Sequence, residues 1–137
     1  MPVLFNIIED GHVVHYHYEQ PWVYSDMARA MEEDRVYRDE IQRTSPGSKV
    51  HVLITMANLG PIPSGALRGR QSASFTHPTS GYVAIVPTST QIRTVANAAL
   101  QLAHFGRARF FDSLESAFAY LHEIIAHEQT PDLQSVR

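Results

Sequence analysis

Residues 49–56 read KVHVLITM, and residues 82–87 read YVAIVP. Both runs are apolar almost without interruption, whereas a strand with one solvated face alternates apolar and polar residues. Continuous apolar runs of this length are typical of strands that are buried on both faces of a parallel sheet. The two runs therefore predict the central strands of an α/β domain.

Residues 3–19 predict a β-hairpin ahead of these strands. Residues 3–8, VLFNII, are apolar and rich in β-branched side chains, and the EDG sequence that follows contains the Asp-Gly pair that often joins hairpin strands. Residues 12–19, HVVHYHYE, alternate with period two. One face then carries Val14, Tyr16 and Tyr18, and the other carries Val13, His15, His17 and Glu19. We expect the tyrosine face to lie toward the core.

Helical patterns flank the first central strand. Apolar residues recur at three- and four-residue steps from about residue 23 to residue 41, which predicts an amphipathic helix. Its middle, around Asp34, is charged on all sides, so we expect the helix to bend or split there. The acidic residues of this segment are expected to form a solvated face. A weakly helical segment rich in small residues follows from Ser64 to about Phe75.

Two further helices are expected in the second half of the chain. Residues 88–90, TST, offer N-cap hydroxyls to a helix that ends at Gly106. After a short strand, ARFF, Asp112 and Glu115 resemble a capping box at the start of the last helix. The inward stripe of that helix is expected to consist of Leu114, Ala117, Phe118, Leu121, Ile124 and Ile125.

The expected element order is β-β-α-β-α-β-α-β-α. Strands that alternate with helices imply right-handed crossovers and a largely parallel sheet. The sequence therefore predicts an α/β fold: a single-domain mixed sheet of about five strands, with an N-terminal antiparallel hairpin followed by βαβα units. Residues 1–128 are expected to form this one domain, and the polar residues 129–137 a frayed tail.

The composition limits the classes of function. A chain of 137 residues, 44% apolar and 18% charged, has the balance of one globular domain. The formal net charge of −3 gives no electrostatic reason to expect nucleic acid or an anionic membrane as a partner. The lack of cysteine excludes disulfides, thiolate catalysis and cysteine-ligated metals. No basic leader region and no stretch of the roughly 18 apolar residues that span a bilayer is found, so we expect a location in the bacterial cytoplasm.

The order of elements, with a buried strand that runs into a Ser-Gly turn and a helix, resembles the STAS family. The closer likeness is to the family's SpoIIAA-like branch, which is related to the anti-sigma factor antagonists. The family motif is roughly an apolar strand, a short loop and then Asp-Ser-Ser-Gly-Leu at the start of a helix. The matching stretch here is LITMANLGPIPSGALRGR, residues 53–70. The stretches YVAIVPTSTQIRTV and RFFDSLESAFAYL are similar to the family's fourth and last strands with their helices.

The resemblance implies a regulatory module without enzymatic activity. In anti-sigma factor antagonists a partner kinase phosphorylates the serine before the glycine, and this controls binding to that partner. Carried over to this sequence, the switch lies at Ser64, with Gly65 and Arg68 beside it at the contact surface. Pro63 stands here at the position of the family's acidic residue.

Elementary chemistry leaves two interpretations of Ser64 open. A helix N-terminus presents unpaired N–H groups and the positive end of the helix dipole, so a phosphate on Ser64 would be stabilised there, within reach of Arg68 and Arg70. The alternative is an N-cap alone, which contributes about 1 kcal/mol to helix stability.

A second candidate site follows the other central strand. Loops that leave the carboxyl ends of neighbouring parallel strands converge, and ligands bind in the crevice between them. If the two central strands are neighbours, Ser64 and the 88–90 loop face one pocket that suits a small anion or a phosphate group. The residues expected there, besides Ser64, are Thr88, Ser89, Thr90 and Arg93. The alternative is that these hydroxyls only cap a helix.

The remaining candidates are weaker. His15 and His17 have a spacing that can chelate a metal, but a third ligand is missing from the pattern, so solvent-facing histidines and no metal are expected. The aromatic and methionine residues near the hairpin favour a core, with an apolar cavity as the alternative. No catalytic motif is found, so neither an enzyme nor a cofactor is expected.

The leading hypothesis is a module that binds a protein partner or itself as a homodimer. The alternative is a carrier or sensor of a small apolar or anionic ligand.

Overall fold

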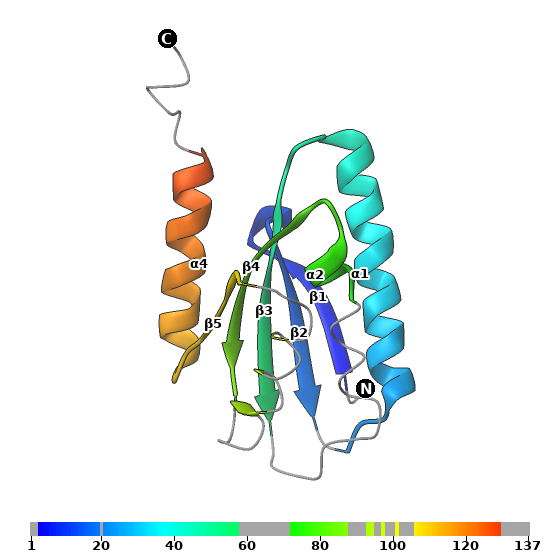
Figure 1. Cartoon of the computed structure of the whole chain (residues 1–137), viewed down its shortest axis with the longest axis vertical. Coiled ribbons are helices and arrows are strands. Elements are labelled where there is room, and N and C mark those ends of the chain that lie inside the picture. The colour runs from blue at the N-terminus through cyan, green and yellow to red at the C-terminus, as the bar shows by residue number, and fades with distance from the viewer. Residues whose placement is uncertain are drawn as a thin grey trace.

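The computed structural model describes residues 3–19, 21–57, 72–87, 93, 94, 97, 101 and 106–129. In this part of the chain five strands form one sheet in the order β1-β2-β3-β4-β5 (Figure 1). The strands are β1 (Val3–Ile8), β2 (Val13–Glu19), β3 (Val50–Ala57), β4 (Ser80–Val86) and β5 (Ala108–Phe110). β1 pairs antiparallel with β2, and all later pairs are parallel. The mixed α/β sheet with an N-terminal hairpin is therefore confirmed.

The two apolar runs form the strands expected of them. β3 lies between β2 and β4, and it pairs in parallel with β4 in a register that places Leu53 opposite Ala84. Val52 and Val83 belong to the core on one face of the sheet, whereas Leu53 and Ala84 belong to the core on the other. Both faces are buried at this point, which is why the sequence shows no polar alternation. The arrowheads of β2, β3 and β4 point to the same end of the sheet in Figure 1.

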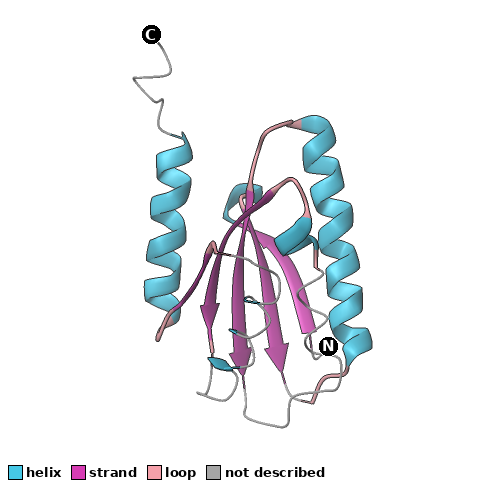
Figure 2. Cartoon of the chain, in the orientation of Figure 1, coloured by secondary structure: helices cyan, strands magenta, loops and turns pink. Residues whose placement is uncertain are grey.

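Helices bury the two faces, and Figure 2 shows the two long helices flanking the sheet. The described helices are α1 (Tyr24–Thr44), α2 (Ala73–Thr76) and α4 (Leu114–Gln129), with a short 3-10 turn, η1 (Glu9–Gly11), between β1 and β2. Ala30 of α1 packs in the core that contains Val14 and Tyr16, so the tyrosine face of the hairpin is covered as expected. Ala117 and Leu121 of α4 pack in the opposite core. No helix in the described ranges is long and apolar enough to cross a membrane.

The hairpin turn explains the glycine at its end. Glu9, Asp10 and Gly11 have φ values of 53°, 55° and 90°. A side chain at Gly11 would be strained by this φ, and its Cβ would lie 2.8 Å from the hydroxyl oxygen of Tyr37. That hydroxyl instead donates a hydrogen bond of 2.7 Å to the carbonyl oxygen of Gly11, which ties the turn to α1.

The expectation that the first helix bends or splits near Asp34 is wrong. α1 is one helix of 21 residues, and Asp34 and Arg38 in its middle are fully buried. The charged segment is therefore not solvated on all sides, because one of its acidic residues faces inward and is hydrogen-bonded there. At its N-terminus the Asp26 carboxylate accepts the backbone N–H of Val23 at 3.0 Å.

The last helix also differs in detail from the expectation. The Ser113 hydroxyl accepts the backbone N–H of Ser116 at 3.1 Å, so Ser113 is the N-cap in place of Asp112. Leu114 was expected to face inward but is 47% exposed, and it is the first residue of the helix. The inward residues that are buried are Ala117, Leu121 and Ile125. The helix continues to Gln129, the first residue of the expected tail.

Candidate functional site

Most of the site residues expected from the sequence lie outside the described residues. This holds for Ser64, Gly65 and Arg68, between β3 and α2, and for Thr88, Ser89 and Thr90, which follow β4. Arg93 is described: it is helical and exposed, and its guanidinium carbon lies 5.0 Å from the centroid of the Phe110 ring. The structure thus defines the frame to which these segments are attached.

The carboxyl ends of β3 and β4, from which these two segments continue, lie next to each other. β3 ends at Ala57 and β4 at Val86, and the two strands are parallel neighbours with Thr55 opposite Val86. The Ser64 segment leaves the sheet after Ala57, and the 88–90 segment leaves after Pro87. Both segments therefore leave from one rim of the sheet, which we call the exit rim, formed by the carboxyl ends of β3 and β4.

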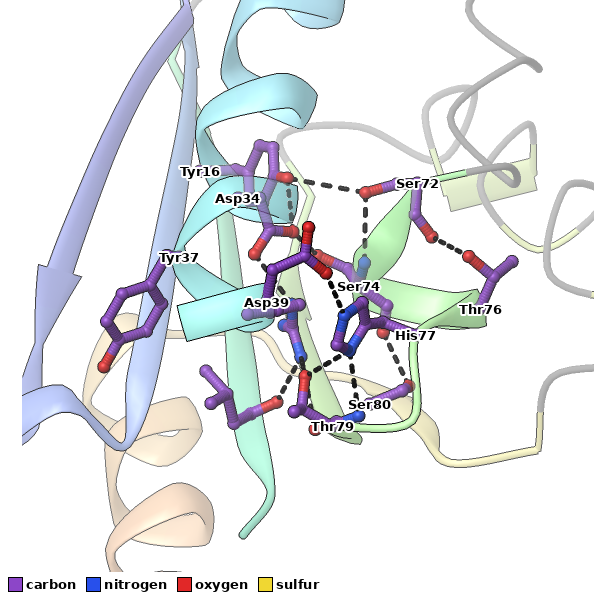
Figure 3. Close-up of polar contacts among 12 residues, drawn as sticks. Tyr16, Asp34, Tyr37, Asp39, Ser72, Ser74, Thr76, His77, Thr79 and Ser80 are labelled. Carbon is purple, nitrogen blue, oxygen red and sulfur yellow. Dashed lines mark hydrogen bonds and ion pairs between the residues drawn. The ribbon is translucent and has the colours of Figure 1, made fainter. Parts of the chain in front are cut away.

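The Ser64 segment returns to the described structure at Ser72, where a buried polar cluster receives it (Figure 3). We call this cluster the Asp34 network. It consists of Tyr16, Asp34, Arg38, Ser72, Ser74 and Thr79. It joins β2, α1, α2 and the turn before β4.

Asp34 is the centre of the network. Its Oδ2 accepts hydrogen bonds of 2.6 Å from the Tyr16 hydroxyl and of 2.6 Å from the Ser74 hydroxyl. Its Oδ1 accepts the Nε–H of Arg38 at 2.7 Å. Burial is the main cause that raises the pKa of Tyr16 far above its ordinary value, and the nearby Asp34 carboxylate is the next. The Tyr16 hydroxyl therefore stays protonated and donates a hydrogen bond to Asp34.

Arg38 connects this centre to two other parts of the backbone. Its Nη1 donates to the carbonyl oxygen of Val50 at 3.0 Å, and to the carbonyl oxygen and hydroxyl of Thr79 at 3.2 and 3.1 Å. Its Nη2 is buried without a hydrogen-bond partner among the described residues. The first residue of β3 and the turn before β4 are therefore held by one guanidinium on α1.

Ser72 and its neighbours form the part of the network closest to the Ser64 segment. The Ser72 hydroxyl accepts the backbone N–H of Ser74 at 3.2 Å as the N-cap of α2, and it lies 3.4 Å from the Tyr16 hydroxyl oxygen. The Ser80 hydroxyl donates to the carbonyl oxygen of Ser74 at 2.7 Å. The Nδ1 of His77 accepts a hydrogen bond from the backbone N–H of Thr79. The proton of the neutral ring then lies on Nε2, which donates a hydrogen bond to Asp39 Oδ1 at 2.8 Å. The return end of the segment is thus fixed from several sides.

A second polar cluster lies on the opposite face of the sheet. His15 Nε2 and His17 Nδ1 each lie 2.7 Å from the hydroxyl oxygen of Thr55, and His17 Nε2 lies 3.3 Å from Glu19 Oε1. Since the hydroxyl has one proton, it donates to one ring and accepts from the other. Burial, and then the neighbouring His17, lower the pKa of His15, so its ring is neutral at neutral pH.

The histidine cluster corrects one expectation. These two histidines were expected to face solvent, but they are half-buried and bonded to Thr55, because the parallel register of β2 and β3 places Thr55 beside them on the same face. No group of three or more His, Cys, Asp or Glu residues that could hold a metal occurs in the ranges described. The aromatic residues follow the core interpretation: Tyr16 and Met27 are buried, and Tyr18, Trp22 and Met31 pack against the same core.

The hydrogen bonds of the Asp34 network indicate what this network can do. In the Asp34 network both carboxylate oxygens accept hydrogen bonds from the chain itself, so the network is suited to holding Ser72 and α2 against α1 and β2. Sequence reasoning missed it, although Asp34 and Arg38 fall four and eight residues after the inward-facing Ala30.

Comparisons with family models, with curated proteins and with solved structures find no match to this chain.

Proposed function

We propose that this chain is a regulatory module without catalytic activity that binds a protein partner at the exit rim, with the Ser64 segment at the contact surface. The observation that carries the proposal is that both ends of this segment are attached to rigid structure. One end continues from Ala57 of the central strand β3, and the other is Ser72, the N-cap of α2 in the Asp34 network. The resemblance of residues 53–70 to the STAS motif points to the same segment.

A segment that is attached to ordered structure at both ends suits partner recognition. Binding residues are often carried by loops on a rigid scaffold, because the scaffold limits the conformational entropy that is lost on association. Here the scaffold is a sheet buried on both faces at β3 and β4. The Asp34 network links α2, which follows this segment, to α1 and β2.

Phosphorylation of Ser64 is the proposed control. A phosphate adds a charge of about −1.5 to −2 and three strong acceptor oxygens, which creates or blocks contacts at a protein surface. Arg68 and Arg70 follow Ser64 closely in the sequence and supply donors for such a group. Because the modification needs ATP and a kinase, the proposed role is a cytoplasmic one.

The experiment is phosphopeptide mapping after incubation with ATP and an extract of the source cells. Phosphate is expected on Ser64 and is expected to be absent from that peptide in Ser64→Ala. Immobilised Ser64→Asp and Ser64→Ala should then retain amounts of one partner that differ by about tenfold, which corresponds to about 1.4 kcal/mol. An unmodified Ser64, together with equal retention by the two variants, would refute the switch.

The alternative of a ligand carrier has less support. A shallow hollow of about 480 Å³ in the described part of the chain is lined by Glu9, Glu115, Phe118, Ala119 and His122. It lies between α4 and the hairpin turn and not at the exit rim, where the sequence placed the ligand. The partner-binding role is proposed first because the attachment of the Ser64 segment at Ala57 and Ser72 supports it.

A further inference from the structure

The two edges of the sheet differ in how they are protected. β5 is an edge strand of three residues, and Arg109 in it is exposed. The Arg109 guanidinium carbon lies 5.4 Å from the ring centroid of Phe111 and 5.0 Å from that of Tyr120, which holds the charge beside the strand. Short length and positive charge are features by which natural sheets prevent pairing at an edge.

β1, the other edge, has none of these features. Its six residues, VLFNII, include no charged residue, proline or glycine. It pairs with β2 in one uninterrupted register, from Val3 opposite Tyr18 to Ile8 opposite Val13. No hydrogen bond from its outer side to another described residue is found.

Apolar side chains also flank the outer edge of β1, which is not paired with any described strand. Leu4 is 38% exposed and Ile7 is 48% exposed. Because side chains alternate along a strand, these two lie on opposite faces of the sheet. An additional strand beside β1 would therefore cover apolar surface on both faces and satisfy the backbone groups of the edge.

We infer that β1 pairs antiparallel with β1 of a second copy of this chain, so that one sheet continues through a two-fold symmetric dimer. A second copy fits because a two-fold axis perpendicular to the sheet brings together two identical edges in antiparallel orientation, and such an interface is complementary to itself. An uncharged strand has no side-chain charge to oppose this pairing, although each chain has a net charge of −3.

The charges next to β1 favour the antiparallel orientation. Glu9 and Asp10 follow the strand directly in the hairpin turn. Parallel pairing would place the two acidic turns side by side. Antiparallel pairing separates them by the length of the strand, about 20 Å for six residues. This exceeds the screening length of about 8 Å at physiological ionic strength, so the turns repel each other little.

The assembly closes at two copies. The two-fold contact uses β1 of both chains and, among the described strands, leaves the β5 edges at the ends of the combined sheet. Those edges carry the protection described above, so further chains do not add. This surface lies on the opposite edge of the sheet from β5 and is separate from the exit rim, so the inference does not depend on the proposed function.

Sedimentation velocity over a wide range of protein concentrations tests the inference. The wild-type chain is expected to sediment as a species with twice its mass of 15.4 kDa. Leu4→Lys combined with Ile7→Lys places two lysines of each copy along the shared edge, one on each face, and is expected to raise the dimer dissociation constant at least about tenfold. The matched control is Val36→Lys, another exposed apolar residue, 54% exposed on α1, which should dimerise as the wild type does.

A cross-linking measurement covers the case in which the lysine variant does not fold. The chain contains no cysteine, so Asn6→Cys and Val36→Cys each introduce a single thiol. A short bis-maleimide should link Asn6→Cys into dimers and should leave Val36→Cys monomeric. A monomeric wild type at every concentration would overturn the inference. So would a folded lysine variant that still dimerises, or equal cross-linking at the two positions.

Discussion

Replacing Arg38 with methionine is expected to lower the free energy of unfolding by about 3–5 kcal/mol, the range measured when one partner of a buried ion pair is removed. Arg38 and Asp34 are both fully buried, and the Nε of Arg38 lies 2.7 Å from Asp34 Oδ1. In the variant the Asp34 carboxylate would keep the hydroxyls of Tyr16 and Ser74 but lose its opposite charge. The carbonyl oxygens of Val50 and Thr79 would also lose a donor.

Arg35→Met is the matched control, since Arg35 lies on the same helix and pairs with Glu32 and Asp39 in an exposed position. Exposed pairs contribute little, because water and salt screen them. Urea unfolding monitored by circular dichroism should therefore show a large fall in midpoint for Arg38→Met and little change for Arg35→Met. Equal shifts in the two variants would mean that the Asp34 network does not stabilise the fold.

Gly81→Ala is expected to destabilise the chain by about 3 kcal/mol, near the upper end of the usual range for overpacking a core. A Cβ at Gly81 would lie 2.3 Å from His51 Nδ1 and 3.2 Å from the carbonyl oxygen of Val50. The His51 ring is fully buried and cannot move aside freely. Its Nδ1 accepts the backbone N–H of Tyr82 at 2.9 Å, and its Nε2 lies 2.8 Å from Glu128 Oε1.

Movement of this ring would leave a backbone N–H of β4 without its acceptor and would release the end of α4 from β3. Gly106→Ala is the control, because a Cβ there meets no atom of the described residues within 4 Å and needs no left-handed backbone. Thermal unfolding should show a clearly lower midpoint for Gly81→Ala and no decrease for Gly106→Ala. An unchanged midpoint in Gly81→Ala would show that the close approach of β4 to His51 is not required.

The parts of the fold that the sequence predicts well are those with a strong local pattern. β3 and β4 are apolar without interruption because a hydrophobic core covers each face of the sheet at these strands. The period-two alternation of β2 identifies the face that carries Val14 and Tyr16, since a strand places alternate side chains on opposite faces.

The buried charges could not be predicted in the same way. A carboxylate in a charged segment is expected in solvent, and only the tertiary structure brings Ser74, 40 residues further along, to Asp34. The spacing of Asp34 and Arg38 within the inward face of α1 was the available signal. It shows which face they share but not that hydroxyls on β2 and α2 complete their hydrogen bonds.

The histidine cluster depended on strand register. His15 and His17 meet Thr55 because β2 pairs with β3 so that His17 lies opposite Thr55. The sequence predicts both strands, but a register shift of one residue would turn these side chains to the other face of the sheet. The expected sites at Ser64 and at residues 88–90 remain predictions, since they lie outside the described residues.

Site-specific photo-cross-linking at the exit rim tests the central claim most directly. A benzophenone amino acid is placed at Ala57, at Pro87 or, as a control, at Ser48, an exposed residue near the amino end of β3. We expect the same partner protein to be captured from positions 57 and 87, which are 30 residues apart in sequence but share one rim, and not from position 48. Capture of no common protein from the two rim positions, or equal capture from position 48, would contradict the account.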